Sequence, residues 1–288
     1  MAIQFKNVTF YYKKKEKYAI QNINLTINQQ NEFIAIIGPI GSGKSTLVQM
    51  MNGLLLPSEG HLEVFHQKIS AKNSSKKLTT LRKKIGLIFQ FPEYQLFETT
   101  VLKDVMFTLN NFKQTNEVIK KISIDALNKV GITSDLFYKS PFQLSSGQQR
   151  KVAIAGILVM NPFILILDEP TRGLDNRSQL EIMHVLKQMY QNEKKTIIFI
   201  THDMDLVAEY ANRVIFLEKG EIIFDGMKDD FFSHKKFSEL ELYEPQTFKI
   251  SRLLEKKLNI SFYPTYSYKN LLEYLRKFYQ KDNIDNDD

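Results

Sequence analysis

The sequence predicts an α/β fold built around a mainly parallel sheet. From residue 33 onward, short apolar β-type runs alternate with segments of helical periodicity, a pattern typical of a parallel sheet covered by helices. Two earlier apolar runs, 3–10 and 20–27, flank a lysine-rich turn and indicate a small antiparallel β subdomain. After about residue 228 the pattern changes to amphipathic helices, so we expect a small helical appendage there.

Each further element is assigned from its pattern in chain order. The expected strands are 33–37, a hairpin within 60–69, and then 85–89, 163–167, 196–200, 214–217 and 221–224. The expected helices are 46–51, 79–84, 147–160, 178–190 and 203–210, and residues 99–130 also have helical spacing. In the appendage, apolar faces are expected at Ile250, Leu253, Leu254 and Leu258, and at Leu271, Leu275 and Phe278, with Pro264 between them. Residues 281–288 are polar and acidic, and we expect a disordered tail.

Composition excludes several classes of protein. None of the 288 residues is cysteine, which excludes disulfides and thiolate metal sites. The N-terminus shows no signal-peptide pattern. The apolar stretch 152–167 is too short for a membrane span and is split by Pro162, so we interpret it as a buried helix and strand. Net charge is +7, with lysines gathered at 13–17 and 72–84, either as solvated loops or as a surface attracted to anionic partners.

A phosphate-binding loop is the clearest functional pattern. The form G-x-x-x-x-G-K-[ST] matches Gly38-Pro39-Ile40-Gly41-Ser42-Gly43-Lys44-Ser45-Thr46. The loop lies between an apolar strand and a helix, where free backbone N–H groups and the helix dipole favour an anion. Lys44 is expected to reach the β- and γ-phosphates of a nucleotide, and the Ser45 hydroxyl to ligate Mg²⁺. The sequence therefore predicts a nucleotide triphosphatase.

Two carboxylates end the apolar strand at 163–167. An acid in this place helps to hold Mg²⁺ in nucleotide triphosphatases, a role that fits Asp168. Glu169 points elsewhere because it is the next residue, and it is the candidate general base for the attacking water. On their own, two acids at a strand end are equally compatible with surface carboxylates that close the strand.

A further sequence motif, at residues 144–148, decides the class of nucleotide triphosphatase. Leu144-Ser145-Ser146-Gly147-Gln148 follows Lys44 by about a hundred residues and precedes the two carboxylates by about twenty, and His202 comes later. Together, these motifs and their order resemble the ATP-binding cassette (ABC) family over residues 1 to about 228. The resemblance implies a phosphate-loop cassette (1–228) with a helical signature subdomain at about 91–160. It also implies ATP and Mg²⁺ as ligands.

The resemblance also implies a dimer. In this family two cassettes pack head to tail, and the signature run, 144–148, completes the ATP site of the partner chain. Ser146 departs from the glycine that is commoner in the signature, which bears on the activity of that site. Other roles carry over by position. Gln90 matches a glutamine that contacts Mg²⁺ and water, His202 a switch histidine near the γ-phosphate, and Asp175 a loop that crosses the dimer interface. Tyr12 matches the aromatic residue that stacks on adenine, with Tyr11 as the alternative.

One segment is more specific. Residues 86–101 (GLIFQFPEYQLFETTV) resemble the ATPase subunits of energy-coupling factor (ECF) transporters, and F-Q-F-P-E-Y-Q-L-F is closer to the second of the two ATPases. Residues 140–144 and 152–156 point the same way. The appendage at 229–280 is expected to help hold two ATPases together. A groove with Phe91, Pro92, Glu93 and Glu98 is expected to receive the transmembrane subunit, where either glutamate pairs with an arginine or both stay solvated.

The resemblance then implies an importer of vitamins or metal ions. Its partners are a second ATPase, expected as a heterodimer, a transmembrane coupling (T) component and an interchangeable substrate-binding (S) component. The chain is expected to sit as a peripheral protein on the cytoplasmic face of the membrane and to bind no nucleic acid. The alternatives are an ATPase of another ABC importer or exporter, and a non-transport cassette acting on DNA or the ribosome. The sequence does not specify the solute.

Overall fold

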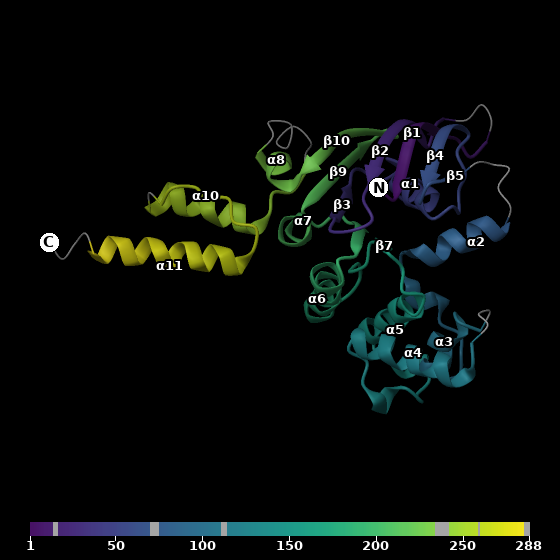
Figure 1. The fold of residues 1–288 in the computed structure, drawn as a ribbon. Helices are drawn as coiled ribbons and strands as arrows, with labels where there is room; N and C mark the ends of the chain where they lie inside the picture. The colour runs from purple at the N-terminus through teal and green to yellow at the C-terminus, as the bar shows by residue number, and fades with distance from the viewer. Residues whose placement is uncertain (14–16, 70–74, 111–113, 234–241, 259, 285–288) are drawn as a thin grey trace.

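A six-stranded sheet forms the centre of the fold, which confirms the α/β prediction (Figure 1). The structure is a computed structural model, and it describes residues 1–13, 17–69, 75–110, 114–233, 242–258 and 260–284. The strand order is β10-β9-β3-β8-β7-β6, parallel throughout except for the antiparallel edge strand β10. The bounds are β3 (Phe33–Ile37), β6 (Ile85–Ile88), β7 (Ile164–Asp168), β8 (Thr196–Ile200), β9 (Arg213–Glu218) and β10 (Glu221–Met227).

The antiparallel subdomain is also present. Its strand order is β2-β1-β4-β5, and both β1 partners run antiparallel. The bounds are β1 (Ile3–Phe10), β2 (Ile20–Ile27), β4 (Glu59–Val64) and β5 (Gln67–Ile69). Helix α1 (Lys44–Met51) packs into the same apolar core through Leu47 and Met50. The subdomain therefore braces the helix that follows the phosphate loop.

The central strands are apolar on both faces because both faces are covered. Along β3, Phe33, Ala35 and Ile37 enter one hydrophobic cluster, while Ile34 and Ile36 enter the other. Successive side chains of a strand point to opposite faces, so a strand buried on both sides is a continuous apolar run. This explains why FIAII, ILIL and TIIFI are interrupted so little by polar residues.

Parallel pairing brings the ends of three strands together. Ile88 of β6 pairs with Leu167 of β7, and Asp168 at the end of β7 pairs with Ile200 of β8. The residues that follow these strands therefore meet at one edge of the sheet. The phosphate loop follows β3, the neighbour of β8, at the same edge. Polar residues far apart in the chain thus converge by topology.

A helical part lies at the lower right of Figure 1. It contains α3 (Val101–Phe107), α4 (Asn116–Lys129) and α5 (Ser146–Leu158), which contribute Val105, Leu127 and Val152 to one cluster. The remaining bounds are α2 (Ser75–Lys84), α6 (Asn176–Glu193), α7 (Met204–Tyr210), and the short 3-10 segments Pro92–Gln95, Ser134–Leu136 and Pro141–Gln143. The apolar stretch 152–167 forms α5 and β7, as interpreted. Within the described ranges, no helix is long and apolar enough to cross a membrane.

The appendage comprises α8 (Lys228–Ser233), α10 (Gln246–Leu258) and α11 (Tyr268–Ile284). In the appendage, α10 and α11 project away from both sheets, whereas α8 lies beside β10 (Figure 1). Its helices are as expected, and the apolar face expected on α10 is not the face that the chain buries. Leu253 and Leu258 are more than half exposed, and the buried residues of α10 are Thr247, Phe248 and Ser251. Aromatic contacts explain the difference, because Phe248 packs against Phe232, Phe262 and Tyr266.

The C-terminal end differs from the expected tail. The tail was predicted to begin at Lys281, whereas α11 continues to Ile284. Residues 281–283 are polar, so the sequence shows no apolar periodicity by which this last turn could be predicted. Residues 285–288 of the predicted tail lie outside the described residues, as do parts of the two lysine clusters, at 14–16 and 72–74.

Candidate nucleotide site

Two glycines allow the phosphate loop to press against neighbouring backbone. Gly38 has a φ of 145°, and a Cβ placed on it would lie 2.0 Å from the Leu217 carbonyl oxygen. Gly43, with a φ of 102°, would bring a Cβ within 2.5 Å of the Ala19 carbonyl oxygen. A side chain at either position would require the backbone to move. The loop conformation therefore depends on glycine at both of its ends.

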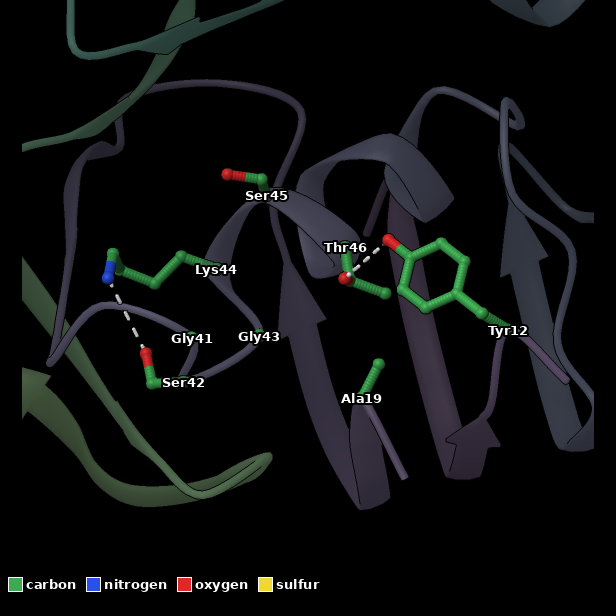
Figure 2. A pocket seen from close by; sticks show the side chains of 8 residues that line it. All are labelled: Tyr12, Ala19, Gly41, Ser42, Gly43, Lys44, Ser45 and Thr46. Atoms are coloured by element: carbon green, nitrogen blue, oxygen red, sulfur yellow. Dashed lines mark hydrogen bonds between the residues drawn. The ribbon is translucent and has the colours of Figure 1, made fainter. Parts of the chain in front are cut away.

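Lys44 is folded onto its own loop. Its Nζ donates to the carbonyl oxygens of Gly38 at 2.7 Å and Pro39 at 2.8 Å, and it also lies 3.5 Å from the Ser42 hydroxyl (Figure 2). Burial lowers the pKa of Lys44, and the charges of Glu169 and Asp168 act in the opposite direction. The ammonium is therefore held at the mouth of the loop by groups that a phosphate could replace.

Tyr12, and not Tyr11, lies in the hollow beside the loop. The hollow encloses about 240 Å³ and is lined by Tyr12, Ala19 and residues 41–46 (Figure 2). The Tyr12 hydroxyl and the Thr46 Oγ1 are hydrogen-bonded at 3.0 Å, yet the side chain remains 61% exposed. Tyr11 instead packs against Tyr18, with ring centroids 6.2 Å apart. Of the two predicted candidates, Tyr12 alone lines this hollow and has ring surface free for a planar base.

Ser45 and Asp168 meet although 123 residues separate them. The Ser45 hydroxyl donates to Asp168 Oδ2 at 2.8 Å. Mg²⁺ prefers oxygen ligands and in nucleotide sites uses one or two protein oxygens together with phosphates and water. A hydroxyl and a carboxylate at hydrogen-bond distance, at the end of the phosphate loop, fit that ion.

Glu169 and His202 form a second pair beside the loop. Glu169 has a φ of 52°, a left-handed backbone conformation that turns its side chain away from Asp168. His202 Nε2 lies 3.2 Å from Glu169 Oε1. Burial, with the negative charge of Asp168, raises the pKa of Glu169, and burial, with the positive charge of Lys44, lowers the pKa of His202. The lowered pKa favours a neutral imidazole at His202, beside the Glu169 carboxyl group.

The pair opens onto a hollow of about 520 Å³ that contacts the other side of the loop. Its lining includes Pro39, Ile40, Glu169, Arg172 and His202. Ile40 is 92% exposed, so the loop rim faces outward here. Gln90 lies in the exposed bend after β6. Among the described residues no hydrogen bond joins it to Ser45 or Asp168, so strand pairing alone places it near them.

The signature run begins helix α5. Ser145 is its N-cap and forms a capping box, in which the Ser145 Oγ accepts from the Gln148 N–H at 3.3 Å and Gln148 Oε1 accepts from the Ser145 N–H at 3.1 Å. Leu144 and Gly147 are buried, whereas Ser145 and Ser146 are exposed. Among the described residues that line the two hollows there is no signature residue. The run lies in the helical part of Figure 1, away from α1.

Asp175 caps the next helix. Its carboxylate accepts from the Ser178 N–H at 3.0 Å and from the Ser178 hydroxyl at 2.7 Å. These two bonds lower the pKa of Asp175. The loop before α6 therefore carries a fixed, ionised carboxylate.

The groove predicted around residues 91–98 differs from expectation at Glu93. Free solvation is wrong for Glu93, because Glu93 is paired internally and its side chain is only 8% exposed. Arg150 donates to Glu93 through Nε at 3.0 Å and Nη2 at 2.6 Å. Glu98 remains partly exposed, and its N–H donates to Asp104 Oδ2 at 2.8 Å. Pro92 is buried and Phe91 lies under the Arg150 guanidinium.

Arg150 is the main site residue that sequence reasoning missed. Its Nη1 also donates to the carbonyl oxygens of Pro170 at 3.1 Å and Arg172 at 2.7 Å, in the segment that follows Glu169. The side chain is 2% exposed. The available signal was its position, an arginine that starts an apolar helical run directly after the signature, but such a residue is more often exposed.

Comparison with known proteins gives a consistent result. A sequence model described as "ABC transporter" matches residues 20–172. The "Energy-coupling factor transporter ATP-binding protein EcfA2" of Bacillus cereus is 41% identical, over 91% of this chain and 90% of that protein. The protein of the same name from Lactobacillus gasseri is 45% identical, over 89% of this chain and 90% of its own length.

Solved structures agree with these relatives. The structure of cbiO1 from Clostridium perfringens, described as part of the ABC transporter complex cbiONQ, has a TM-score of 0.75 and 36% identity, and covers 90% of this chain and 96% of that one. A dimeric ATP-binding cassette in a post-hydrolysis state with ADP and Pi has a TM-score of 0.69 and 33% identity, and covers 78% and 98%.

Proposed function

The chain belongs to the ABC transporter family, as an ATP-binding protein of energy-coupling factor transporters, and from this premise we propose which residues perform its ATPase reaction. The protein is the ATPase subunit of an ECF-type importer. The observation that carries the assignment of roles is the convergence at one sheet edge of Ser45 with Asp168, at 2.8 Å, and of Glu169 with His202, at 3.2 Å.

ATP binds in the hollow beside the phosphate loop. Tyr12 stacks on the adenine, and the backbone N–H groups of residues 38–46 surround the phosphates. Lys44 exchanges its bonds to the Gly38 and Pro39 carbonyls for phosphate oxygens. Ser45 and Asp168 would hold Mg²⁺, with Gln90 after the adjacent strand β6, and the ion would neutralise charge on the phosphate oxygens.

Glu169 positions and deprotonates the attacking water. Its raised pKa makes the ionised form of Glu169 a better proton acceptor than an ordinary carboxylate. His202 donates its Nε2 proton to Glu169 and so fixes the carboxylate, which leaves one carboxylate oxygen for the water. The reaction otherwise depends on position and electrostatics, as is usual for phosphoryl transfer.

The signature completes the ATP site of a partner ATPase. Leu144-Ser145-Ser146-Gly147-Gln148 lies apart from this chain's own loop, and a helix N-terminus is a favourable place for an anion. Two chains packed head to tail would bring this helix to the partner's γ-phosphate, with Asp175 in the interface. The partner is a second, different ATPase. The names of the relatives, which number them as A2, support a pair of distinct subunits.

The complex also contains a transmembrane coupling component and an exchangeable substrate-binding component. Together they would import vitamins or metal ions, with this chain at the cytoplasmic face of the membrane. Phe91, Pro92 and Glu98 form the part of the groove that would receive the coupling component, because Glu93 is paired with Arg150. Residues 1–228 form the cassette, with its helical subdomain at about 91–160, and 229–280 form the appendage that helps the two ATPases to associate. No role with nucleic acid is proposed.

Purification of the tagged protein from detergent-solubilised membranes tests the assembly. We expect a second cassette ATPase and small polytopic membrane proteins to co-purify, whereas a conventional paired permease would contradict the proposed partners. The Ser145→Arg variant tests the head-to-tail arrangement within that complex. It should retain ATP binding at this chain's own loop and lose turnover at the facing site. Loss of ATP binding at its own loop would contradict the arrangement.

A further inference from the structure

The signature helix α5 and the next long helix, α6, meet along one line. Gly147 of α5 lies against Ser178 of α6, and one helical turn further along each helix Lys151 Nζ is paired with Glu181 at 2.5 Å. Residues three and four positions apart share a helix face, so the two contacts belong to one interface. The interface joins the run that would meet the partner's nucleotide to the loop that carries Asp175.

Contact at Gly147 is closer than any other residue would allow. A Cβ built on Gly147 would lie 2.4 Å from Ser178 Oγ and 2.8 Å from Ser178 Cβ. Real Cβ atoms do not approach other heavy atoms so closely, so a side chain here would force the helices apart. Gly147 is also buried, whereas Ser145 and Ser146, which precede it, are exposed. The requirement for glycine therefore comes from the contact with this chain's own α6.

Ser178 fixes the Asp175 loop through its other contacts. Its hydroxyl donates to Asp175 Oδ2 at 2.7 Å and its N–H donates to Asp175 Oδ1 at 3.0 Å. Bonds to an ionised carboxylate are among the stronger hydrogen bonds in proteins. One small side chain thus touches the signature glycine on one side and holds the interface carboxylate on the other.

We propose that Ser178 is a positioning residue that makes the signature and the Asp175 loop one rigid edge, so that both reach the partner's ATP site in a fixed relation. This proposal rests on the proposed head-to-tail arrangement. Ser178 touches neither nucleotide, and it acts through Gly147 and Asp175. The effect of changing it should therefore appear in turnover of the assembled complex and not in ATP binding to this chain's own loop.

A steric rescue tests the contact at Gly147. Gly147→Ala should lower turnover of the purified complex at least about tenfold, since overpacking a close contact displaces its elements. Ser178→Gly removes both atoms that would clash, so Gly147→Ala combined with Ser178→Gly should turn over as fast as Ser178→Gly alone. Gly156→Ala, on the same helix, is the matched control, because the nearest atom to its added Cβ is 3.9 Å away, and it should leave turnover unchanged.

Ser178→Ala tests the bond to Asp175 and separates positioning from stability. It keeps the packing and removes one charge-assisted hydrogen bond, and we expect turnover at saturating ATP to fall about 3- to 10-fold. ATP affinity at this chain's own loop and the Tm should stay close to those of the parent. A residue with only a structural role would lower the Tm and leave turnover below that temperature unchanged.

Different results would overturn different claims. If the double variant is as slow as Gly147→Ala, or if Ser178→Ala turns over like the parent, the proposal for Ser178 is wrong. If Gly147→Ala has no effect while Ser145→Arg abolishes turnover, the same conclusion follows and the head-to-tail arrangement stands. If Ser145→Arg also leaves turnover intact, the proposed arrangement itself fails.

Discussion

Removal of the Arg150 guanidinium should destabilise the cassette more than removal of any exposed charge. Arg150 is 2% exposed and makes two bonds to the Glu93 carboxylate and two to the carbonyls of Pro170 and Arg172. Arg150→Met keeps the apolar stem and its packing near Phe91 but removes every donor. The carboxylate of Glu93, 8% exposed, would then be buried without a partner.

The loss of stability in Arg150→Met follows from the Glu93 carboxylate that the variant leaves without a partner. Breaking a buried ion pair by removing one partner costs about 3–5 kcal/mol, because the other charge stays desolvated. For a chain of this size that corresponds to a fall in Tm of roughly 6–20 °C. Adding Glu93→Leu removes the stranded charge and should recover most of the loss. Recovery should be incomplete, since the carbonyls of Pro170 and Arg172 still lack their donor.

Urea unfolding and thermal scans of the four proteins in this cycle measure the effect. Arg177→Met is the matched control, because its side chain is 88% exposed and its pair with Glu181 is a surface pair worth less than about 1 kcal/mol. A single variant as stable as this control would refute the claim that Arg150 holds the two segments together. So would a double variant that is less stable than Arg150→Met.

Three further predictions concern the nucleotide site. Glu169→Gln should bind ATP like the parent and turn over about 10²- to 10⁴-fold more slowly in the complex, and near-normal turnover would remove Glu169 from the role of base. Tyr12→Ala should weaken ATP binding about 3- to 10-fold by calorimetry, as expected for loss of one stacking contact, whereas Tyr11→Ala should leave binding unchanged. If Tyr11→Ala weakens binding and Tyr12→Ala does not, Tyr11 is the stacking residue. Because the pKa of Glu169 is raised on folding, the parent loses stability relative to Glu169→Gln as pH rises from the ordinary glutamate range through the folded-state pKa. The difference in Tm should therefore close at acid pH, and a difference independent of pH would contradict the assigned shift.

Much of the fold could be predicted because the core strands are short and uniformly apolar. FIAII at 33–37 and TIIFI at 196–200 are strands with the predicted bounds, and the strand predicted at 163–167 is shifted by one residue to Ile164–Asp168. Helical periodicity also located α6, and the apolar run after the signature located α5. The appendage was harder, because Leu253 and Leu258 form an apolar helical face that remains exposed in a single chain. An amphipathic pattern predicts a face to be covered, but it does not say whether the cover comes from the same chain.

The site could be predicted where local pattern carries the chemistry. The loop residues from Gly38 to Thr46 and the pair of acids at the end of β7 are adjacent in sequence, so their types and order were sufficient. Contacts between distant segments were not predictable in this way. The pairing of Glu93 with Arg150 and the contact of Gly147 with Ser178 depend on how helices cross, and nothing in either local sequence specifies the partner.

The distribution of contacts bears on the proposed head-to-tail dimer. The sheet edge around this chain's own phosphate loop brings together the Lys44 ammonium, the Ser45 hydroxyl and the carboxyl groups of Asp168 and Glu169. The second anion-binding place, at the start of α5, is turned away from that loop, and its exposed residues Ser145 and Ser146 face outward. The capping box satisfies the N–H groups of Ser145 and Gln148, whereas the first N–H groups of a helix have no partner within it. In the proposed head-to-tail arrangement, the nucleotide of a second cassette would supply an anion for these groups, and that cassette would gain the same help for its own site. Dimerisation and nucleotide binding would then favour each other, which is how ATP could drive a transporter.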